Sequence, residues 1–560
     1  MLSSATLDDQ VADRAWRLRL EPLLLVLAAG LLYTIHLGRL PNPDELHHVI
    51  AAHGLLVDGR PSIAEGIYTR GLLYTWLVAG SYALFGQESL AIARFPSVVC
   101  MALLVGVLFV WLRREADRRA AWLGAVLFAV SPFAVDIAQF ARFYAPQCLT
   151  FFVAAILLHA AVLTPAGLAR RALLAGLALP CLLLALHLQP TTLIGLVGIG
   201  VWAAGCFVLP WLVAPDVPPA RRRAIVLGLL GAGLVLLAAL WLTGILGDLW
   251  HRYRWTPLFN RKEQEQFWYY HAWFSLLYPT LWPLTGLLGL VAVAARPRAA
   301  AFALVTFAVA FLLNSLAAAK SLRYIVYAQP FLFAVWGIGL ASLWPGLRAG
   351  ARHLRAELAD RLAFLGPAYR PLGGVLVASG LLFLLLANPF WLRTASLLAD
   401  ITVPPEQPAP DWPKVKAALE PWVARADIVV TTEELATLYF LGRYDVRFSP
   451  SKLEELDRDQ QHEFGIDFRT GRPVIATRES LERILACYPT GIVLGPEASW
   501  NHPILITPEL ARLIQAHAEP IPLPRDSHVF AYRWARPADT APPAACAGLP
   551  SFAHRKTGSP

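Results

Sequence analysis

The sequence predicts a polytopic α-helical membrane protein that ends in a small α/β domain. Of its 560 residues, 57% are hydrophobic and 16% are charged, and the mean hydropathy is +0.51. Soluble domains are about 45–50% apolar and about 25% charged. Long apolar runs between residues 21 and 393 are the second observation, and a proline-rich stretch followed by alternating strand and helix patterns is the third.

The apolar runs predict how often the chain crosses the membrane. Residues 1–20 are polar and are predicted to be a cytoplasmic lead, and residues 21–393 are predicted to form the membrane domain. A helix needs about 20 apolar residues to cross a bilayer. About eleven runs meet this requirement, at residues 21–38, 90–112, 120–138, 148–164, 172–189, 192–213, 225–247, 276–295, 299–317, 325–345 and 373–393.

Arginine clusters between the runs predict the orientation. They fall on alternate loops, on the same side as the N-terminus, and the positive-inside rule places that side in the cytoplasm. An odd number of spans then places the C-terminal region outside, in the periplasm of a bacterial inner membrane. The clusters explain the formal charge of +9 without nucleic acid as a partner; they are Arg113, Arg114, Arg118 and Arg119; Arg170 and Arg171; Arg221, Arg222 and Arg223; Arg296 and Arg298; and Arg348, Arg352, Arg355, Arg361 and Arg370.

The first external loop, residues 40–89, opens with an unusual pair of carboxylates. Two prolines, Pro41 and Pro43, end the first span, and Asp44 and Glu45 follow directly. A carboxylate at the edge of the lipid is costly unless it faces a polar cavity, so the pair is a candidate functional site. The alternative is a solvated turn next to the membrane. The rest of the loop is predicted to hold amphipathic helices at the interface.

Other external loops carry cations that the positive-inside rule would not place there. Arg70 lies in the first loop, Arg142 and Tyr144 follow the third span, and Lys320, Arg323 and Tyr324 precede a late span. Arginine suits a phosphate because its fork of donors matches phosphate oxygens. These residues therefore predict an anionic ligand. The alternative is that their long side chains snorkel at the interface.

The C-terminal region is predicted to be a small external domain. Residues 394–410 are a proline-rich linker, residues 411–536 an α/β domain and residues 537–560 a disordered tail. Cys487 and Cys546 can pair if this region is extracytoplasmic. The run Phe440–Asp445 is predicted to be a strand and turn. Strands are expected at residues 427–431, 491–494 and 528–534, and helices at 411–425, 478–488 and 507–517.

Four short motifs in order resemble the C-type superfamily of integral-membrane glycosyltransferases. The resemblance is to the branch with the protein O-mannosyltransferases, the lipid A aminoarabinose transferases and the Rgt-type galacturonosyltransferases, and it covers roughly residues 20–345. Where that family has Tyr-x-x-Pro, this chain has Tyr324 and Tyr327, with the next proline at Pro330. The motifs are Asp44-Glu45 after the first span; Tyr68-Thr69-Arg70-Gly71 with Leu84-Phe85-Gly86 and Ala93-Arg94-Phe95-Pro96-Ser97; Gln139-Phe140-Ala141-Arg142-Phe143-Tyr144; and Lys320-Ser321-Leu322-Arg323-Tyr324.

The resemblance implies a role for each matched position. Asp44 matches the catalytic acidic residue of the first external loop, and Glu45 is a second catalytic candidate. Arg142, Tyr144, Lys320 and Arg323 match residues that hold the donor phosphate. Arg70 and Tyr324 are candidates for other substrate contacts.

Together with these residues, the resemblance implies a glycosyltransferase with the C-type fold. It would move a sugar from a polyprenyl-phosphate donor to a hydroxyl of a lipid, glycan or protein on the outer face of the membrane, with inversion at the anomeric carbon. No metal or cofactor is expected, because His47, His48 and His53 lack a regular ligand spacing, although some members of the superfamily use a divalent cation. The alternative function is a transporter or flippase for a lipid-linked anion. Two observations count against it: the spans hold few charges, and the sequence has no internal repeat.

Overall fold

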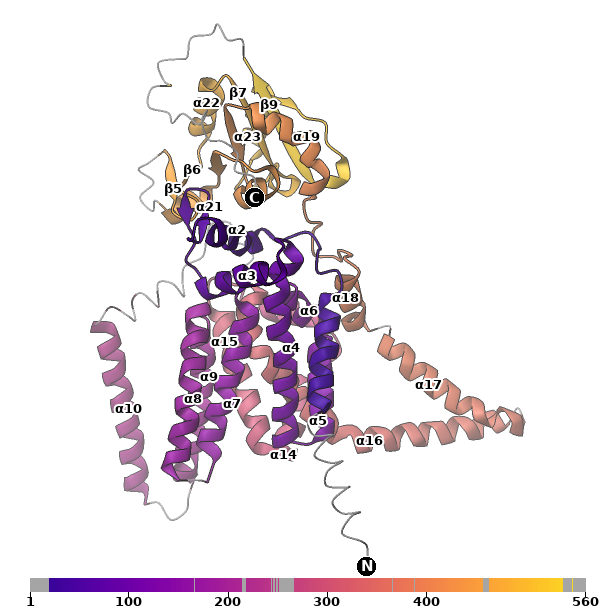
Figure 1. Cartoon of the computed structure of the whole chain (residues 1–560). Helices are drawn as coiled ribbons and strands as arrows, with labels where there is room; N and C mark the ends of the chain where they lie inside the picture. The colour runs from indigo at the N-terminus through magenta and orange to yellow at the C-terminus, as the bar shows by residue number, and fades with distance from the viewer. Residues whose placement is uncertain are drawn as a thin grey trace, which may run out of the picture.

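The protein is described by a computed structural model that covers residues 20–165, 167–213, 218–242, 266–364, 366–386, 388–456 and 463–536, together with residues 244, 247, 250 and 546. Figure 1 shows a bundle of long helices with an α/β domain above it, and short helices lying across the top of the bundle between the two. We call the end of the bundle that lies next to the α/β domain the domain-bearing face. The predicted polytopic helical fold with a C-terminal α/β domain is confirmed.

The helices of the bundle follow the predicted apolar runs. Among the described residues, five helices are long and apolar enough to cross a membrane, or up to six if one bent pair is a single span. The count of about eleven spans therefore stays a prediction. The helices are Leu20–Thr34, α4 (Leu90–Glu115), α5 (Arg118–Ala129), α6 (Pro132–Ala138), α7 (Tyr144–Leu163), α8 (Leu168–Leu188), α9 (Thr192–Val213), α10 (Pro219–Leu242), α13 (Tyr269–Leu277), α14 (Thr285–Ala295), α15 (Pro297–Leu316), the 3₁₀ helix η2 (Leu322–Ala328), α16 (Gln329–Ala363), η3 (Pro367–Tyr369), α17 (Arg370–Leu386) and α18 (Pro389–Leu398).

The run predicted as one span at residues 120–138 is broken. Helices α5 and α6 meet at an angle of 61°. Pro132 has no N–H to continue α5 and takes the first position of α6, while the Ser131 hydroxyl accepts the N–H of Ala134. The break leaves a short non-helical segment, residues 139–143, between α6 and α7.

Ion pairs bring three of the predicted cytoplasmic arginines together at one end of the bundle. Glu21 pairs with Arg113 and Arg118, which end α4 and begin α5. Arg296, between α14 and α15, lies 3.6 Å from Asp117. The loops on which these clusters lie therefore meet at one end, as alternate loops of a helical bundle do.

The first loop forms two helices and a hairpin at the domain-bearing face. They are α2 (Pro43–Val57), β1 (Ser62–Ile63), β2 (Gly66–Ile67) and α3 (Leu72–Phe85). Pro43 does not exclude a helix, because it occupies the first helical position, where the N–H has no intrahelical partner. Gly71 begins α3 with a φ of 61°, and a Cβ there would lie 2.4 Å from the Phe143 ring.

The α/β domain contains a seven-stranded sheet in the order β5-β6-β4-β3-β7-β9-β8. Strands β6, β4, β3 and β7 are parallel, and β5, β9 and β8 are antiparallel additions at the two sides. The run Phe440–Asp445 ends a helix and turns at Gly442, so its predicted strand is wrong. The elements are α19 (Trp412–Arg425), β3 (Ile428–Thr431), α20 (Glu434–Leu441), β4 (Val446–Phe448), α21 (Pro450–Leu456), β5 (Gly465–Asp467), β6 (Arg472–Ile475), α22 (Arg478–Cys487), β7 (Thr490–Pro496), η4 (Glu497–Ser499), α23 (Pro508–His517), β8 (Glu519–Pro520), η5 (Arg525–Ser527) and β9 (Val529–Ala535).

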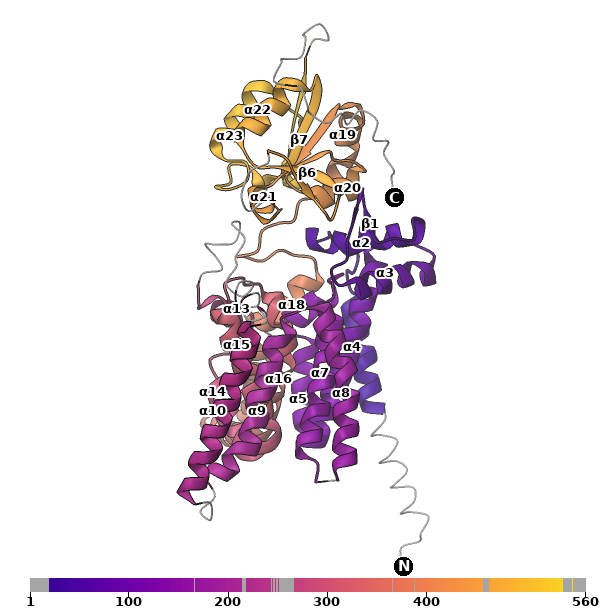
Figure 2. The same ribbon diagram turned by 90° about the vertical axis from the view of Figure 1, so that its left-hand side faces the viewer.

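Alternate residues of β3 face different cores. Ile428 and Val430 pack with α22 and α23, whereas Val429 belongs to the core that includes α19 and α20. The core that includes α19 and α20 is continuous with the core of the helical bundle. Figure 2 shows α20 above α2 and β1, so the α20 face of the domain meets the first loop.

Cys487 and Cys546 form a disulfide across a sequence separation of 59 residues. Apart from Cys546, the predicted tail at residues 537–560 lies outside the described residues, as do residues 1–19. The pairing that the sequence left open is therefore present, and it ties the chain beyond β9 to the end of α22.

We expect the disulfide to stabilise the α/β domain by on the order of 4 kcal/mol, because it closes a long loop in the unfolded chain. The double variant Cys487→Ser with Cys546→Ser should show faster hydrogen exchange in β7 and β9 of the full chain. The single variant Cys100→Ser, which removes a thiol in the bundle, is the control. Equal exchange in the double variant and the wild type would contradict the expectation.

Candidate active site

Asp44 lies in the first turn of α2, and the residues around it determine where this helix starts. The backbone of Asn42 is extended, and its side-chain oxygen accepts the Asp44 N–H at 3.1 Å. Asn42, Pro43 and Glu45 together form a capped helix start with a proline at the first position. The backbone of Asp44 is therefore held at the domain-bearing face, where α2 lies across the bundle (Figure 1).

The Asp44 carboxylate is held between two arginines. Its Oδ2 lies 2.8 Å from Arg323 Nη1, and its Oδ1 lies 3.8 Å from Arg142 Nη1. Burial raises the pKa of the Asp44 carboxyl, but the attraction of Arg142 and Arg323 outweighs it and holds the pKa well below its usual range. The side chain of Asp44 is still 39% exposed, so this ionised carboxylate faces solvent.

Arg142 lies in the short segment between α6 and α7. Hydrogen bonds to other elements hold that segment in place: the Gln139 amide donates to the carbonyl of Ile35, and the Ser97 hydroxyl donates to the carbonyl of Phe140. Arg142 Nη1 donates to the Asp44 carbonyl, and its Nε is buried with no hydrogen-bond partner among the described residues.

Arg323 belongs to η2 and lies over two aromatic rings. Its guanidinium carbon is 5.0 Å from the ring centre of Phe140 and 5.9 Å from that of Tyr144. Such cation–π contacts stabilise a guanidinium away from bulk water. The structure therefore brings Tyr144 to the site beneath Arg323, as an aromatic support.

Two further predicted residues lie around the same segment. Arg70 lies 5.5 Å from the ring centre of Phe143 and donates to the Gln189 side chain at 3.4 Å. The charge of Arg70 helps to lower the pKa of Asp44. Tyr324 follows Arg323 directly in η2. Arg70 therefore adds positive charge to the site, and Tyr324 is placed there by its neighbour Arg323.

Lys320 is placed differently from Arg323. Its buried ammonium donates to the carbonyl of Ala317 at 2.6 Å, at the end of α15. Of the predicted late basic pair, Arg323 is the member whose ion pair with Asp44 is seen.

The Glu45 side chain is buried in the protein and is not open to solvent. Its carboxylate is almost fully buried and forms a two-point ion pair with Arg94, with distances of 2.8 and 2.7 Å. It also accepts the backbone N–H groups of Asn42 and Ala141. Since both oxygens are occupied, the geometry does not support the predicted catalytic role of Glu45.

Arg94 lies within the Ala-Arg-Phe-Pro-Ser motif, and its role is visible only in the structure. Besides Glu45, it donates to the carbonyls of Leu37, Arg39 and Leu40. It therefore joins the end of the first span to the start of α2. The Ala-Arg-Phe-Pro-Ser motif is the signal that marks it.

The histidines of α2 point in different directions. His47 contacts Asp44 and the α/β domain, and His48 Nδ1 lies 2.9 Å from the Thr75 hydroxyl. His53 pairs with Glu88 instead. Among the residues that the structure describes, no group of three or more His, Cys, Asp or Glu side chains is arranged to hold a metal ion.

A cavity of about 820 Å³ opens beside the site. Its wall includes the chain before α2, the Arg323 side chain and the aromatic residues Tyr269 and Trp273 of α13. Residues between 400 and 411 line it too, together with Asp526 and His528 of the α/β domain. A ligand in this cavity can therefore reach Arg323.

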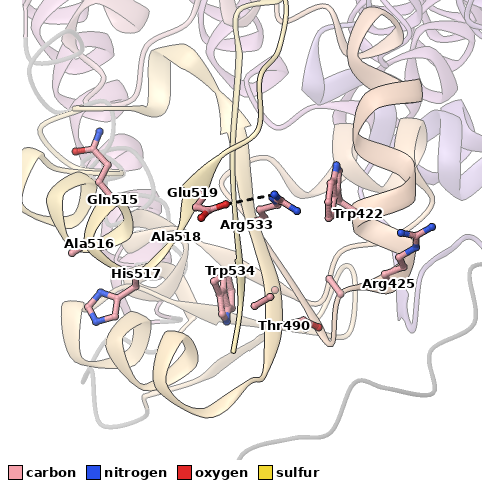
Figure 3. A pocket seen from close by; sticks show the side chains of 13 residues that line it. Trp422, Arg425, Thr490, Gln515, Ala516, His517, Ala518, Glu519, Arg533 and Trp534 are labelled. Atoms are coloured by element: carbon pink, nitrogen blue, oxygen red, sulfur yellow. Dashed lines mark hydrogen bonds and ion pairs between the residues drawn. The ribbon is translucent and has the colours of Figure 1, made fainter. Parts of the chain in front are cut away.

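A second pocket, of about 570 Å³, lies within the α/β domain. Figure 3 shows Arg533 between Glu519 and Trp422, and its guanidinium carbon is 4.0 Å from the centre of the Trp422 ring system. The pocket includes Gly491, which pairs with Ile428 at the amino end of β3. It is therefore at the opposite end of β3 from α20, and it contains none of the predicted site residues.

The chain is similar to known proteins in part of its sequence and in its fold. Residues 69–214 match the family model described as dolichyl-phosphate-mannose-protein mannosyltransferase. The structure of ArnT from Cupriavidus metallidurans bound to undecaprenyl phosphate is similar with a TM-score of 0.56 and 15% identity, covering 91% of this chain and 97% of that one. Its apo structure gives a TM-score of 0.57 and 15% identity over 93% and 98% of the two chains. No curated protein matches the sequence at a significant level.

Together, the fold shared with ArnT over nearly the whole chain and the match at residues 69–214 confirm the resemblance to the C-type superfamily of integral-membrane glycosyltransferases.

Proposed function

We propose that the protein transfers a sugar from a polyprenyl-phosphate donor to an acceptor hydroxyl, with Asp44 as general base. The observation that carries this proposal is the exposed Asp44 carboxylate held between Arg323 and Arg142 beside a cavity. A base for the acceptor and two cations for a phosphate leaving group are thus in direct contact. The undecaprenyl phosphate bound to ArnT supports this class of donor.

The reaction needs one bond to form and one to break. The acceptor oxygen attacks the anomeric carbon, and its proton passes to an Asp44 carboxylate oxygen. The bond from the anomeric carbon to the phosphate oxygen breaks, and polyprenyl phosphate leaves with the electron pair. Arg142 and Arg323 balance the charge of that leaving group. Attack from the face opposite the phosphate inverts the anomeric carbon.

The same two arginines connect donor binding to the basicity of Asp44. While they pair with Asp44, its pKa is too low for a strong base. A donor phosphate competes with Asp44 for both guanidinium groups. Donor binding therefore raises the pKa of Asp44 and prepares it to accept a proton.

The ion-paired arginine end of the bundle supports the orientation. Arginine-rich loops face the cytoplasm in most membrane proteins, and here they join α4 to α5 and α14 to α15. The domain-bearing face is the other end of the bundle (Figure 1). We therefore place Asp44 and the α/β domain on the extracytoplasmic side, in the periplasm if the membrane is a bacterial inner membrane.

We expect Arg323→Gln and Arg142→Gln to raise the KM for the donor by about 10- to 150-fold, since a hydrogen bond to a charged group contributes about 1.5–3 kcal/mol. The acid limb of the pH profile of kcat/KM should move to higher pH in Arg323→Gln, because Arg323 lowers the pKa of Asp44 and the base must be ionised. Initial rates at several donor concentrations and pH values measure both effects.

The matched control is Arg60→Gln, which removes an exposed arginine from the same first loop. Its donor KM should equal that of the wild type. If all three variants behave alike, the loss reflects general surface charge, and Arg142 and Arg323 do not hold the phosphate.

The function itself is tested without knowing the acceptor. A strain that lacks the protein is compared with the same strain carrying the wild-type chain, and envelope glycolipids, glycans and glycoproteins are analysed by mass spectrometry. We expect one sugar to be missing in the first strain and restored in the second, and the mass difference names the sugar class. Identical profiles contradict a transferase. Accumulation of the sugar-charged polyprenyl phosphate on the cytoplasmic leaflet alone indicates a flippase.

A further inference from the structure

The α/β domain meets the first loop through the turn between β5 and β6. The backbone N–H of Glu65 donates to the carbonyl of Thr470 at 3.1 Å, and the Glu65 carboxylate pairs with Arg472 at 2.8 Å. A Cβ on Gly66 would lie 2.5 Å from the Arg469 backbone, so only glycine allows this approach. The turn therefore docks onto the β1–β2 hairpin with a defined register.

Arg469, in that turn, has one side of its guanidinium fixed within its own domain. Its Nε and Nη2 lie 3.0 and 2.6 Å from the two oxygens of Asp467, and Nη2 is 3.4 Å from Glu434. The remaining nitrogen, Nη1, lies 2.8 Å from His47 Nε2. The guanidinium is therefore oriented by its own carboxylates and directed at a histidine of α2, 422 residues away in the sequence.

This contact determines which nitrogen of His47 carries the proton. Arginine can only donate, so His47 Nε2 accepts and has no hydrogen. The proton of the neutral ring is then on Nδ1, which lies 3.2 Å from the carbonyl oxygen of Asp44 and donates to it. Arg142 Nη1 donates to the same oxygen, and its distance to His47 Nδ1 is longer, at 3.4 Å. The backbone of Asp44 is thus held by two donors, one of which depends on Arg469.

We propose that Arg469 is a positioning residue through which the α/β domain fixes the tautomer of His47 and, with it, the orientation of Asp44. This inference rests on the proposed function, because its effect is on the base of that reaction. It gives the α/β domain a part in catalysis without contact with the reacting atoms. Loss of the contact frees the ring to put its proton on Nε2, and the Asp44 carbonyl then loses a donor.

The charges around His47 support a neutral ring. Burial, Arg469 and Arg142 lower the pKa of His47 well below its ordinary value, and only Asp44 acts in the other direction among the charged groups that face it. The Tyr68 ring lies 4.9 Å away, and His48 on the same helix is also held neutral by burial and Arg142. Without Arg469 the pKa of His47 rises, and an imidazolium beside Asp44 would weaken the base at mildly acidic pH.

The test uses the full chain in lipid, with a polyprenyl-phosphate sugar as donor and water or the identified acceptor as acceptor. We expect Arg469→Ala to lower kcat by on the order of 10- to 100-fold, since small misplacements of a catalytic group have effects of this size. The donor KM should change less than about twofold, and activity should fall at a higher pH than in the wild type. Arg469→Lys, which can still donate to His47 Nε2, should recover part of kcat.

Two variants of His47 separate the two ends of the ring. In His47→Asn the amide nitrogen takes the place of Nδ1 and can still donate to the Asp44 carbonyl. In His47→Gln the amide oxygen takes the place of Nε2 and can still accept from Arg469, but the donor to Asp44 is lost. The inference requires His47→Asn to keep more of kcat than His47→Gln, and the reverse order overturns it.

Glu65→Gln is the matched control, because it breaks the ion pair with Arg472 at the same interface without touching His47. If it lowers kcat as much as Arg469→Ala does, the domain acts only by docking, and the inference is wrong. Equal activity of Arg469→Ala and the wild type also overturns it while the proposed function stands. A wild-type protein that transfers no sugar in the strain comparison above contradicts the function itself, so the two failures are distinguishable.

Discussion

Asp44→Asn should lower the rate of sugar transfer by about 10²- to 10⁴-fold, the contribution of a general base, while the donor still binds. The amide cannot take the acceptor proton, but it keeps the shape of the side chain. Because the variant also removes the anion that occupies Arg142 and Arg323, the donor phosphate should bind as tightly as in the wild type or more tightly. Single-turnover transfer and equilibrium binding of the polyprenyl phosphate measure the two effects separately.

The matched control is Asp58→Asn at the other end of α2, where the carboxylate accepts a hydrogen bond from Ser62 at 2.7 Å. It should transfer sugar at the wild-type rate. If Asp44→Asn keeps its activity, Asp44 is not the base. If it loses donor binding together with transfer, Asp44 acts in building the site and not in the proton transfer.

Much of this arrangement could be predicted from the sequence because it depends on local signals. Apolar runs gave the helices of the bundle, since lipid demands long apolar segments. In the α/β domain, buried runs such as Ile428–Thr431 gave the central strands. Motif order was enough to bring Asp44, Arg142 and Arg323 together, because these residues lie on loops at the same face of the bundle.

What could not be predicted depends on contacts between distant residues. No local pattern connects Arg469 to His47, because the contact is made by two docked surfaces. The break between α5 and α6 follows from Ser131 and Pro132, but an apolar run reads as one span whether or not it bends. Short strands such as β4, β5 and β6 have only three or four residues each and give too little periodicity to be detected.

The two neighbouring carboxylates show this limit most clearly. In the sequence, Asp44 and Glu45 are equivalent candidates. On a helix they point about 100° apart, so one can face solvent while the other enters the core. The partner of Glu45 is Arg94 on α4, and that pair is almost fully excluded from water. The structure thus separates a half-exposed carboxylate, our proposed base, from a buried carboxylate at the adjacent position.

Glu45→Gln should therefore destabilise the fold by about 3–5 kcal/mol, because it leaves the buried Arg94 without its counter-charge. We expect a lower thermal midpoint in detergent and less folded protein in the membrane, with near wild-type transfer per folded molecule. Glu88→Gln removes the half-exposed partner of His53 in the same loop and should cost no more than about 1 kcal/mol, as exposed ion pairs do. A Glu45→Gln protein that is as stable as the wild type but transfers no sugar would return Glu45 to the catalytic residues. The opposite results for Asp44→Asn and Glu45→Gln, activity lost with the fold intact and fold lost with the chemistry intact, are the strongest expectation that the geometry of this site supports.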